Sequence, residues 1–344
     1  MSTGVLLVNL GTPDSPRTSD VRRYLRQFLH DPYVIDTSSV ARWLLVEGAI
    51  LPFRPRVSAR AYASIWLEAG SPLLVHGLAL RDALATALGE GVRVALGMRY
   101  GSPSIESGLR ELAGAERVLV VPLFPQYATS STETAVEAVR RAAGGVRLET
   151  FEAFYDDPGF IAAWTEVAKP ELEQFRPDHV LLSFHGLPER QIRKLDASGR
   201  HCLESESCCD AIGEANRSCY RAQCFATARA LARALDLDDD RYSVAFQSRL
   251  GRTPWIRPYT DERFVELPKS GVRRLAVLCP AFVADCLETL EEIGIRGREQ
   301  WREAGGEALH LVPCLNAHPR WVEALAARIR EELASSEPGR PGQG

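Results

Sequence analysis

The chain has 344 residues, a length that suggests about two domains. Hydrophobic residues make up 45% and charged residues 25%, which is an ordinary globular composition with ample apolar material for a core. The formal net charge of −4 excludes a strongly basic protein, so we expect no nucleic-acid partner. No apolar run approaches the roughly 18–20 residues of a membrane span, and we expect no transmembrane segment.

The N-terminal residues predict a buried strand rather than a signal peptide. The stretch MSTGVLLVNLGTPDSP has no basic residues ahead of its short apolar run, which a Gly-Thr-Pro turn ends at once. We therefore expect a cytoplasmic protein. At the other end, the small, polar, proline-broken stretch SSEPGRPGQG leads us to expect a disordered tail over residues 331–344.

Along the chain, short apolar strands alternate with helix-length stretches. Near-continuous Val/Leu strands separated by helices are typical of a parallel sheet covered on both faces. The expected strands are 5–10, 92–98, 117–124, 146–154, 178–185, 242–248, 275–282 and 309–313. The clearest helical stretches are 71–88, 133–142, 222–235 and 284–294.

The chain also carries a sign of internal duplication. VNLGTP at 8–13 can be laid on SFHGLP at 183–188, and LVVPLFPQYATSSTET from Leu119 on LAVLCPAFVADCLET from Leu275. Two unrelated α/β strands can look this much alike, but a duplication predicts an α/β fold of two similar doubly wound parallel-sheet halves. The active cleft would lie between them, since open α/β sheets bind ligands beyond the carboxyl ends of their strands. The two halves would be residues 1–165 and 166–330.

In that alignment Leu10 and His185 occupy equivalent strand ends. His185 follows an apolar strand and precedes Gly186 and Pro188, where a lone histidine can be a hydrogen-bonded structural residue. Its strand-end position favours the ligand crevice instead. Imidazole suits both proton transfer near neutral pH and metal ligation.

Glu288 lies in PAFVADCLETLEEIG, which predicts a helix that is N-capped near Asp285 and ends near Gly294. Glu288 and Glu292 are four residues apart and share a face, with Asp285 close by. Most such runs are solvated acidic faces. This one follows a buried strand directly, so its first turn should face the cleft, where a file of carboxylates could hold and pass a divalent cation. A histidine and a glutamate together suit ferrous iron without excluding zinc, cobalt or nickel.

Nearly the whole chain, from Gly4 to about Leu325, resembles the ferrochelatases. The similarity begins with LLVNLGTPDSP and VRRYLRQFLHDPYVID, continues through GSPLLVHGLAL and ALGMRYGSPSI, and extends over VPLFPQYATSST, LLSFHGLPER, AFQSRLGRTPW and CPAFVADCLETLEE. One block alone would be weak evidence. The blocks in the right order make a specific match.

The resemblance implies a porphyrin metal chelatase, with roles for the matched positions. His185 would stand at the point of metal insertion and Glu288 would be its carboxylate partner across the porphyrin. Asp285 and Glu292 would extend the acidic line as a path for metal or protons. The macrocycle pocket would be lined by Leu10, Arg99, Tyr100, Tyr127 and Trp255, although core packing is an even alternative for the aromatic residues. Arg54 and Arg56 fall near family positions that hold propionates.

The reaction itself dictates what such a pocket must do. Two pyrrole N–H protons leave as Fe²⁺ enters, and a flat porphyrin hides its nitrogen lone pairs, so the ring must buckle. A rigid pocket can hold it part-way there, at about 1–5 kcal/mol of strain drawn from binding energy, while His185 or Glu288 accepts protons. One departure from the family is Cys286, where some relatives have a histidine, which casts doubt on a histidine-based metal route beside Glu288.

Five of the eight cysteines fall within residues 202–224, in the spacing C-x5-CC-x9-C-x4-C. Clustered cysteines in a reducing cytoplasm more often bind metal than form disulfides, and the spacing lacks the C-x2-C pairs of a zinc finger. The segment is similar to the internal cysteine segment of some bacterial ferrochelatases, which implies a 2Fe–2S cluster on four thiolates. The favoured four are Cys208, Cys209, Cys219 and Cys224, with Cys202 a close substitute. Unligated surface thiols are the alternative. We expect residues 197–224 to project as an insertion beside the cleft.

The expected substrates are therefore ferrous iron and protoporphyrin IX, in the terminal step of haem biosynthesis. Coproporphyrin III, another tetrapyrrole chelatase such as a cobalt chelatase, and a non-catalytic haem or iron–sulfur sensor on the same scaffold are the alternatives. Peripheral contact with a membrane stays open, as do the oligomeric state and the side from which iron enters.

Overall fold

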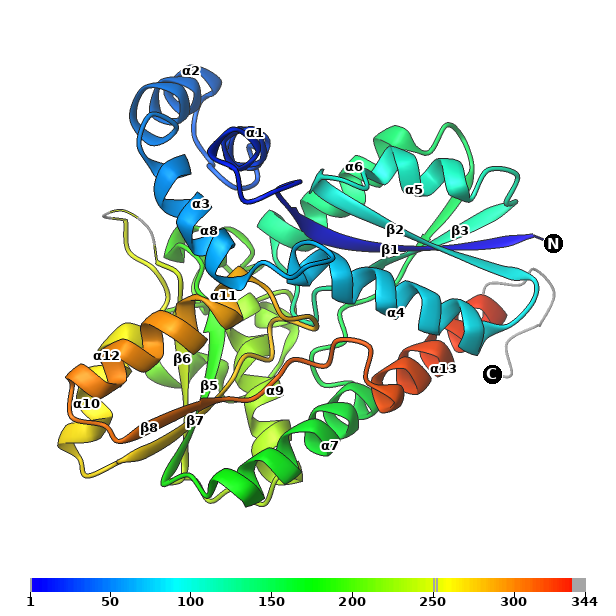
Figure 1. Ribbon diagram of the computed structural model, residues 1–344. Helices are drawn as coiled ribbons and strands as arrows, with labels where there is room; N and C mark the ends of the chain where they lie inside the picture. The colour runs from blue at the N-terminus through cyan, green and yellow to red at the C-terminus, as the bar shows by residue number, and fades with distance from the viewer. Residues whose placement is uncertain (1, 250, 252, 336–344) are drawn as a thin grey trace.

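The computed structural model describes residues 2–249, 251 and 253–335, which form two four-stranded parallel sheets (Figure 1). The strands are β1 (Thr3–Thr12), β2 (Val92–Gly101), β3 (Arg117–Pro122), β4 (Arg147–Thr150), β5 (His179–His185), β6 (Tyr242–Gln247), β7 (Arg274–Leu278) and β8 (Ala308–Leu311). The sheet orders are β2-β1-β3-β4 and β6-β5-β7-β8. In each half, the strand that comes second in the sequence lies at one edge, followed by the first, the third and the fourth. This shared order confirms the two similar halves expected from the sequence.

Helices connect the strands, as a parallel sheet requires. The N-terminal half contains α1 (Thr18–Leu29), α2 (Ser39–Trp43), the π-helix η1 (Leu44–Ile50), α3 (Arg54–Ile65), α4 (Pro72–Leu88), α5 (Ile105–Glu111), the π-helix η2 (Thr129–Glu133) and α6 (Thr134–Ala142). After α7 (Pro158–Phe175) follow α8 (Glu189–Lys194), the 3₁₀ turns η3 (Glu206–Cys209) and η4 (Glu214–Asn216), α9 (Tyr220–Ala234), α10 (Thr260–Lys269), α11 (Leu287–Leu290), the π-helix η5 (Glu292–Gly297), α12 (Arg298–Glu303) and α13 (Pro319–Ser335).

The strands bury both faces, because consecutive side chains point to opposite sides of the sheet. In β1, Val5 and Leu7 join the largest core cluster, while Leu6 and Val8 pack on the other face with α5 and α6. The largest cluster also contains Leu182 and Phe184 of β5. The two halves therefore share one continuous core, which fixes the ends of their strands relative to each other.

The expected division of the chain needs two adjustments. The boundary at 165/166 falls inside α7, so a single helix, buried along one face, connects the two halves. The expected tail of 331–344 starts too early, because α13 continues to Ser335 and packs against α4 and α7. Residues 336–344 lie outside the described residues. Assignment of the halves as domains stays a prediction.

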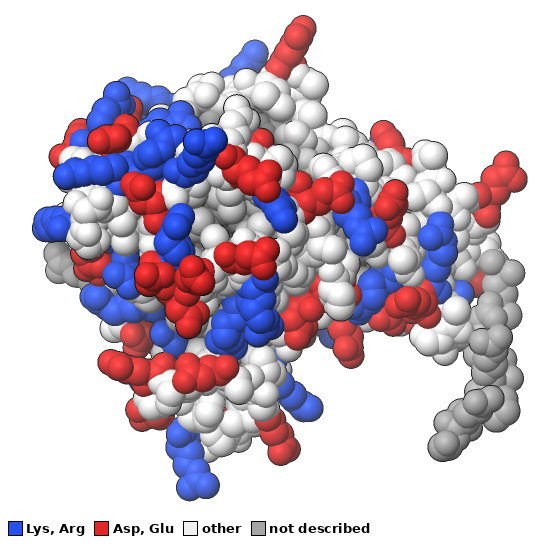
Figure 2. All heavy atoms as spheres, turned by 90° about the horizontal axis from the view of Figure 1, so that it is seen from below, with Lys and Arg blue, Asp and Glu red and all other residues white. Residues whose placement is uncertain are grey.

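The lengths of the helices and the charges on the surface bear on the function. No helix among the described residues is long and apolar enough to cross a membrane. Figure 2 shows acidic and basic side chains interspersed over the face seen from below, without a broad area of either sign.

Candidate active site

His185 is the last residue of β5, and the turn that follows it is packed tightly on β6. The Gly186 amide donates to the Gln247 carbonyl at 2.8 Å. A Cβ atom at Gly186 would lie 2.8 Å from that carbonyl oxygen and 3.2 Å from the Trp255 ring. Only glycine lets the chain pass so close, which explains the residue that follows the histidine.

The imidazole of His185 is oriented by its own backbone. Its Nδ1 lies 2.6 Å from the Gly186 carbonyl oxygen, which can only accept, so Nδ1 carries the hydrogen. In the neutral ring Nε2 then keeps the lone pair that a proton or a metal ion needs. The ring centroid lies 6.5 Å from that of Trp255 and 6.3 Å from that of Phe282, which meets it edge-on. The structure thus brings Trp255 and His185 together.

Gln247, the last residue of β6, ties three segments together. Its backbone oxygen accepts from Gly186, its side-chain oxygen accepts from Ser183 at 2.7 Å, and its side-chain nitrogen donates to the Glu288 carbonyl at 2.7 Å. The residue is 3% exposed, so each lost bond would leave a buried polar group unpaired. The sequence interpretation missed Gln247, although the strand-end rule that selected His185 applies equally to it.

The helix around Glu288 differs from the predicted one. Its N-cap is Cys286 rather than Asp285, and α11 spans only Leu287–Leu290. Gly294 does not end the helix but lies within η5, and helical structure continues through α12 to Glu303. The prediction was wrong because the Asp285 carboxylate, the expected cap, is used elsewhere.

Asp285 is held by residues far away in the sequence. Its carboxylate accepts from the Asn316 amide at 2.8 Å, from the Thr289 hydroxyl at 3.2 Å and from the Cys314 backbone at 3.3 Å. Its backbone amide donates to Asn316 at 2.9 Å. These contacts describe a carboxylate that fixes the loop before α11. Its place on a metal path stays a prediction.

Glu292 connects the two principal candidates electrostatically. Burial raises its pKa, and the negative charge of Glu288 adds to the rise, whereas a hydrogen bond from Ser248 and the positive charge of His185 oppose it. Both the backbone amide and the hydroxyl of Ser248 donate to its carboxylate, at 2.9 and 2.5 Å. Glu292 therefore holds a proton more readily than an exposed glutamate and lies within range of both His185 and Glu288.

Residues of the N-terminal half also lie close to Glu288. Burial raises the pKa of Tyr24, and the Glu288 charge adds to that rise; the same charge acts on the buried Tyr62. Tyr24 donates to the Gly11 carbonyl at 3.1 Å. Leu10 and Leu287 pack against the same cluster of α1 and α3 side chains, and α11 contacts α3. The strand end of β1 and the Glu288 helix thus meet in one place.

Arg99 and Tyr100, both expected to line the pocket, bind the buried carboxylate of Asp31. Arg99 and the Tyr100 hydroxyl lie 2.5 and 2.7 Å from the same oxygen, and Thr134 donates to it at 2.6 Å. Burial acts to raise the pKa of Asp31, but the hydrogen bonds, led by that of Thr134, and the charge of Arg99 lower it overall. Tyr100 is 2% exposed, so little of it can face a ligand.

The remaining expected pocket residues are Tyr127, Arg54 and Arg56. Tyr127 donates its hydroxyl to Glu133 at 3.0 Å, and its backbone amide donates to Gln223 of α9 at 2.7 Å. Burial and the Glu133 charge raise the pKa of Tyr127 to about 12. Arg54 and Arg56 are exposed at the start of α3.

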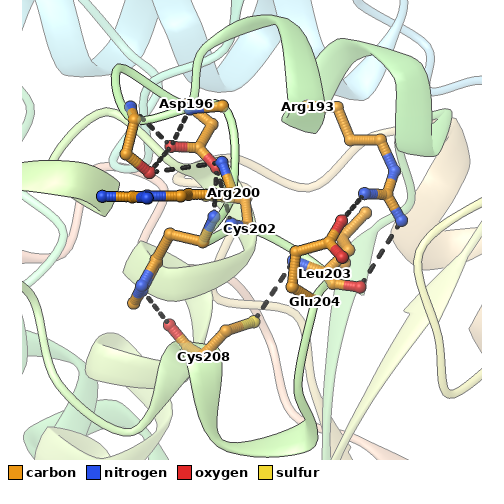
Figure 3. A network of polar contacts seen from close by, with 10 residues as sticks. Arg193, Asp196, Arg200, Cys202, Leu203, Glu204 and Cys208 are labelled. Carbon is orange, nitrogen blue, oxygen red and sulfur yellow. Dashed lines mark hydrogen bonds and ion pairs between the residues drawn. The ribbon is translucent and has the colours of Figure 1, made fainter.

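Hydrogen bonds hold the cysteine segment in a defined conformation, packed into the core, so it is not the projecting insertion that we expected (Figure 3). Asp196 accepts hydrogen bonds from the backbone amides of four residues, Ser198, Gly199, His201 and Cys202, and these bonds lower its pKa strongly. His201 lies 3.1 Å from the Cys208 carbonyl, and Asn216 donates to the same carbonyl at 3.0 Å. The five thiols are buried and belong to the main core cluster.

Four of these thiols form a chain of contacts. The thiol of Cys219 is hydrogen-bonded with those of Cys202 and Cys209, and the Sγ atoms of Cys208 and Cys209 are 3.7 Å apart. Cys224 instead bonds with the Tyr220 hydroxyl. Burial raises the pKa of Cys202 and Cys208. No group of three or more His, Cys, Asp or Glu side chains among the described residues is arranged to hold a single metal ion.

A surface groove of about 980 Å³ runs along α7 and α9 and includes neither His185 nor Glu288. It is lined by Ala230 and Ala234 near the end of α9, about 20 Å along the helix from Tyr220, at 1.5 Å per residue. The cleft expected between the two halves therefore stays a prediction.

Comparison with known proteins decides the family. The family profile described as Ferrochelatase matches residues 2–333. A ferrochelatase of Azotobacter vinelandii is 55% identical over 95% of this chain and 98% of its own length. A ferrochelatase of Coxiella burnetii is 51% identical over 96% and 94%.

The chain belongs to the ferrochelatase family. It is a porphyrin metal chelatase, as the sequence resemblance implied. A solved structure of SirB from Bacillus subtilis with Fe3+ has a TM-score of 0.53 at 16% identity and covers 98% of this chain and 97% of the SirB chain, which shows a shared fold. The positions of individual site residues in this ferrochelatase rest on the geometry above.

The hydrogen bonds of Gln247 predict a specific defect. Gln247→Met keeps the length of the side chain but frees the Glu288 carbonyl, so α11 should shift. We expect kcat for metal insertion to fall about tenfold or more, because small misplacements of reacting groups are costly, with porphyrin affinity little changed. Gln126→Met is the matched control, since Gln126 is an equally buried amide that bonds Thr227 instead. Equal losses of kcat in both variants would contradict a positioning role for Gln247.

Proposed function

We propose that this ferrochelatase inserts Fe²⁺ into protoporphyrin IX, with His185 and Glu288 facing each other across the macrocycle. The supporting observation is that Glu292 is buried within range of both residues, while Nδ1 of His185 is engaged with Gly186. His185 contributes a nitrogen lone pair, and the carboxylate of Glu292 is close enough to interact electrostatically with both His185 and Glu288. That donor set suits a divalent first-row metal and the two protons it displaces.

The same residues can accept the two protons that the reaction releases. Two pyrrole N–H bonds break as the four ring nitrogens bind Fe²⁺, so two protons must leave the ring. Nε2 of His185 accepts one of them, and the glutamates accept the other. Glu292 suits this role because burial raises its pKa, so it holds a proton more readily than an exposed glutamate does. Glu288, whose backbone Gln247 fixes, approaches the metal.

The pocket walls follow from the residues beside these groups. Trp255 and Phe282 pack against the His185 ring, and Leu10 covers the opposite strand end. A rigid wall on each face is what holds a porphyrin in a buckled form. Arg99, Tyr100 and Tyr127 contribute through the shape of the N-terminal half, since the first two are engaged with Asp31. Asp285 acts by fixing the start of α11.

The surface around Arg54 and Arg56 favours protoporphyrin IX over coproporphyrin III. These two arginines could each bind a propionate. Phe53 (74%) and Val57 (68%), next to them in the sequence, are exposed, as are four apolar side chains on the preceding α2 and η1: Val40 (69%), Trp43 (57%), Leu44 (58%) and Leu45 (43%). An apolar surface suits vinyl groups better than the two additional carboxylates of coproporphyrin III.

The same apolar surface, on α2, η1 and α3, also suits peripheral contact with a membrane. Exposed apolar patches of this kind mark interaction sites, and Trp and Phe beside arginines are typical of helices that lie at a bilayer interface. A hydrophobic porphyrin would then reach the enzyme without crossing water. All eight cysteines are free thiols, which suits a reducing cytoplasm.

The cysteine segment fits a 2Fe–2S cluster by the chemistry of its donors. Arg221 points its guanidinium at Sγ of Cys209, 3.0 Å away, and of Cys208, 3.9 Å away, and the Leu203 amide donates to Sγ of Cys208 at 3.4 Å. Such N–H donors stabilise the negative charge of cluster thiolates. When bound, a cluster would add one-electron redox chemistry and folding stability to this segment.

The contacts among the thiols favour one ligand set. Cys202, Cys208, Cys209 and Cys219 are connected through Cys219 and the 3.7 Å sulfur contact, and Cys224 is engaged with Tyr220. We therefore infer that Cys202 is a ligand and Cys224 is not, in place of the set that compact spacing favoured. Thiolates would replace the protonated thiols that bond to one another here.

An anaerobic assay of the purified protein tests the substrate. With Fe²⁺, we expect kcat/KM for protoporphyrin IX to exceed that for coproporphyrin III at least tenfold. The reverse order would establish the coproporphyrin enzyme. Insertion of Co²⁺ into another tetrapyrrole only would indicate a different chelatase, and no insertion would indicate a sensor.

Substitution of Glu288 tests its role. Glu288→Gln should retain porphyrin binding within about threefold but lose kcat by about a hundredfold, because the amide can neither accept a proton nor balance Fe²⁺. Glu292→Gln should lose less. Glu291→Gln is the matched control, since Glu291 is a buried neighbour paired with Arg296. A crippled Glu292→Gln beside an active Glu288→Gln would mean that the glutamates are assigned in the wrong order.

Iron and acid-labile sulfide analysis tests the cluster. Anaerobically prepared protein should contain about two irons and two sulfides per chain and be coloured. Cys202→Ser should lose both and be less stable, because cluster binding adds to folding free energy, while Cys224→Ser should keep them. Cys314→Ser, far from the segment in sequence, should also keep the colour. Zinc without sulfide, or a cluster retained by Cys202→Ser, would contradict the proposal.

Vesicle binding tests the apolar surface. The double variant Trp43→Ser, Phe53→Ser should sediment with anionic phospholipid vesicles at least fivefold less than the unchanged protein, because it loses two exposed aromatic side chains. Val265→Ser, on α10, removes an exposed apolar residue elsewhere and should bind normally. Equal binding by all three proteins would contradict membrane contact through this apolar surface.

A further inference from the structure

Three consecutive residues at the start of α9 connect the cysteine segment to the candidate active site. Cys219 caps the helix, and its thiol bonds with those of Cys202 and Cys209. The Tyr220 hydroxyl donates to the His185 carbonyl at 2.8 Å. Arg221 faces the sulfurs of Cys208 and Cys209. The middle residue thus contacts His185 while both of its neighbours contact the thiols.

Neighbouring residues restrain the first turn of α9, so Cys219, Tyr220 and Arg221 cannot move independently of one another. Tyr220 is 5% exposed, and its hydroxyl is also bonded with Cys224 in the next turn. Arg221 donates from Nε to the Arg257 carbonyl at 3.3 Å. Further along α9, Gln223 and Thr227 bond to the segment after β3. A displacement of Cys219 or Arg221 must therefore be carried by Tyr220.

We propose that Tyr220 is a positioning residue that couples the state of the cysteine-bound cluster to His185. The inference rests on the proposed cluster and on the proposed role of His185. An electron transferred to a bound cluster from a one-electron donor would strengthen the attraction between the sulfurs and the Arg221 guanidinium, because Coulomb forces are strong at such distances in a buried setting. The start of α9 would respond, and the Tyr220 hydroxyl would move the backbone from which the His185 ring projects.

Coupling of this kind is reciprocal. If the cluster's oxidation state changes porphyrin affinity at His185, a bound porphyrin must change the cluster's reduction potential by the same free energy. A threefold difference in affinity corresponds to a shift of about 28 mV for a one-electron couple, at 59 mV per tenfold. The potential thus reports the coupling without any measurement of turnover.

The experiment is a redox titration of the cluster, followed by the electron paramagnetic resonance signal of the reduced form, with and without zinc protoporphyrin IX, which is already metallated and cannot react. In the unchanged protein, bound porphyrin should shift the midpoint potential by about 28 mV or more. Tyr220→Phe should keep its iron, sulfide and porphyrin binding but show less than a third of that shift. Tyr242→Phe, which removes a hydroxyl at the opposite end of β6, should keep the full shift.

The outcomes separate this inference from the proposed function. A full shift in Tyr220→Phe, or none in the unchanged protein, would overturn the coupling while leaving cluster and catalysis in place. Absence of sulfide from the unchanged protein would remove the cluster and the coupling with it, but not the roles of His185 and Glu288. Should Tyr220→Phe fold poorly, Arg221→Gln provides a second test, because it keeps the Tyr220 contact but loses the charge; a full shift there would equally overturn the inference.

Discussion

The hydrogen bonds of Gln247 are the constraint on which the proposed site depends. One buried side chain and its carbonyl bind the turn after His185, the hydroxyl of Ser183 and the backbone of Glu288. The histidine belongs to a strand end and the glutamate to a short helix that begins elsewhere in the sequence. Without a common partner, their separation would follow the fluctuations of two independent loops. Burial makes each of these bonds costly to break, so His185 and the backbone of Glu288 are held in place relative to each other.

Packing between the two halves also fixes the strand ends and α11 relative to one another. The shared core of β1 and β5 fixes the two strand ends, and α11 reaches the helices of the N-terminal half beside Tyr24 and Tyr62. Glycine is required near the end of each of these strands, because a side chain at Gly11 or Gly186 would collide with the carbonyl of Tyr100 or Gln247. Both halves therefore share a glycine that avoids a clash with a neighbouring strand, as well as the same strand order.

Much of this arrangement could be predicted from the sequence, because it depends on local patterns. Buried strands, their Gly/Pro turns and the position of His185 follow from hydrophobic periodicity and the strand-end rule. The helix after Asp285 could not be predicted, because its cap was decided by Asn316, 31 residues later. The cysteine contacts were equally hidden, since compact spacing favoured Cys224, whereas the loop held by Asp196 and Asn216 brings Cys202 to Cys219.

The central claim is that His185 and Glu288 act together on one step of metal insertion. A double-mutant cycle tests it most directly, with kcat/KM measured anaerobically for Fe²⁺ and protoporphyrin IX in His185→Ala, Glu288→Gln and the double variant. Groups that act as a unit show strongly non-additive losses, so the double variant should be impaired about as much as the worse single variant. Losses that multiply, so that the double variant falls by the product of the two single factors, would contradict a shared site.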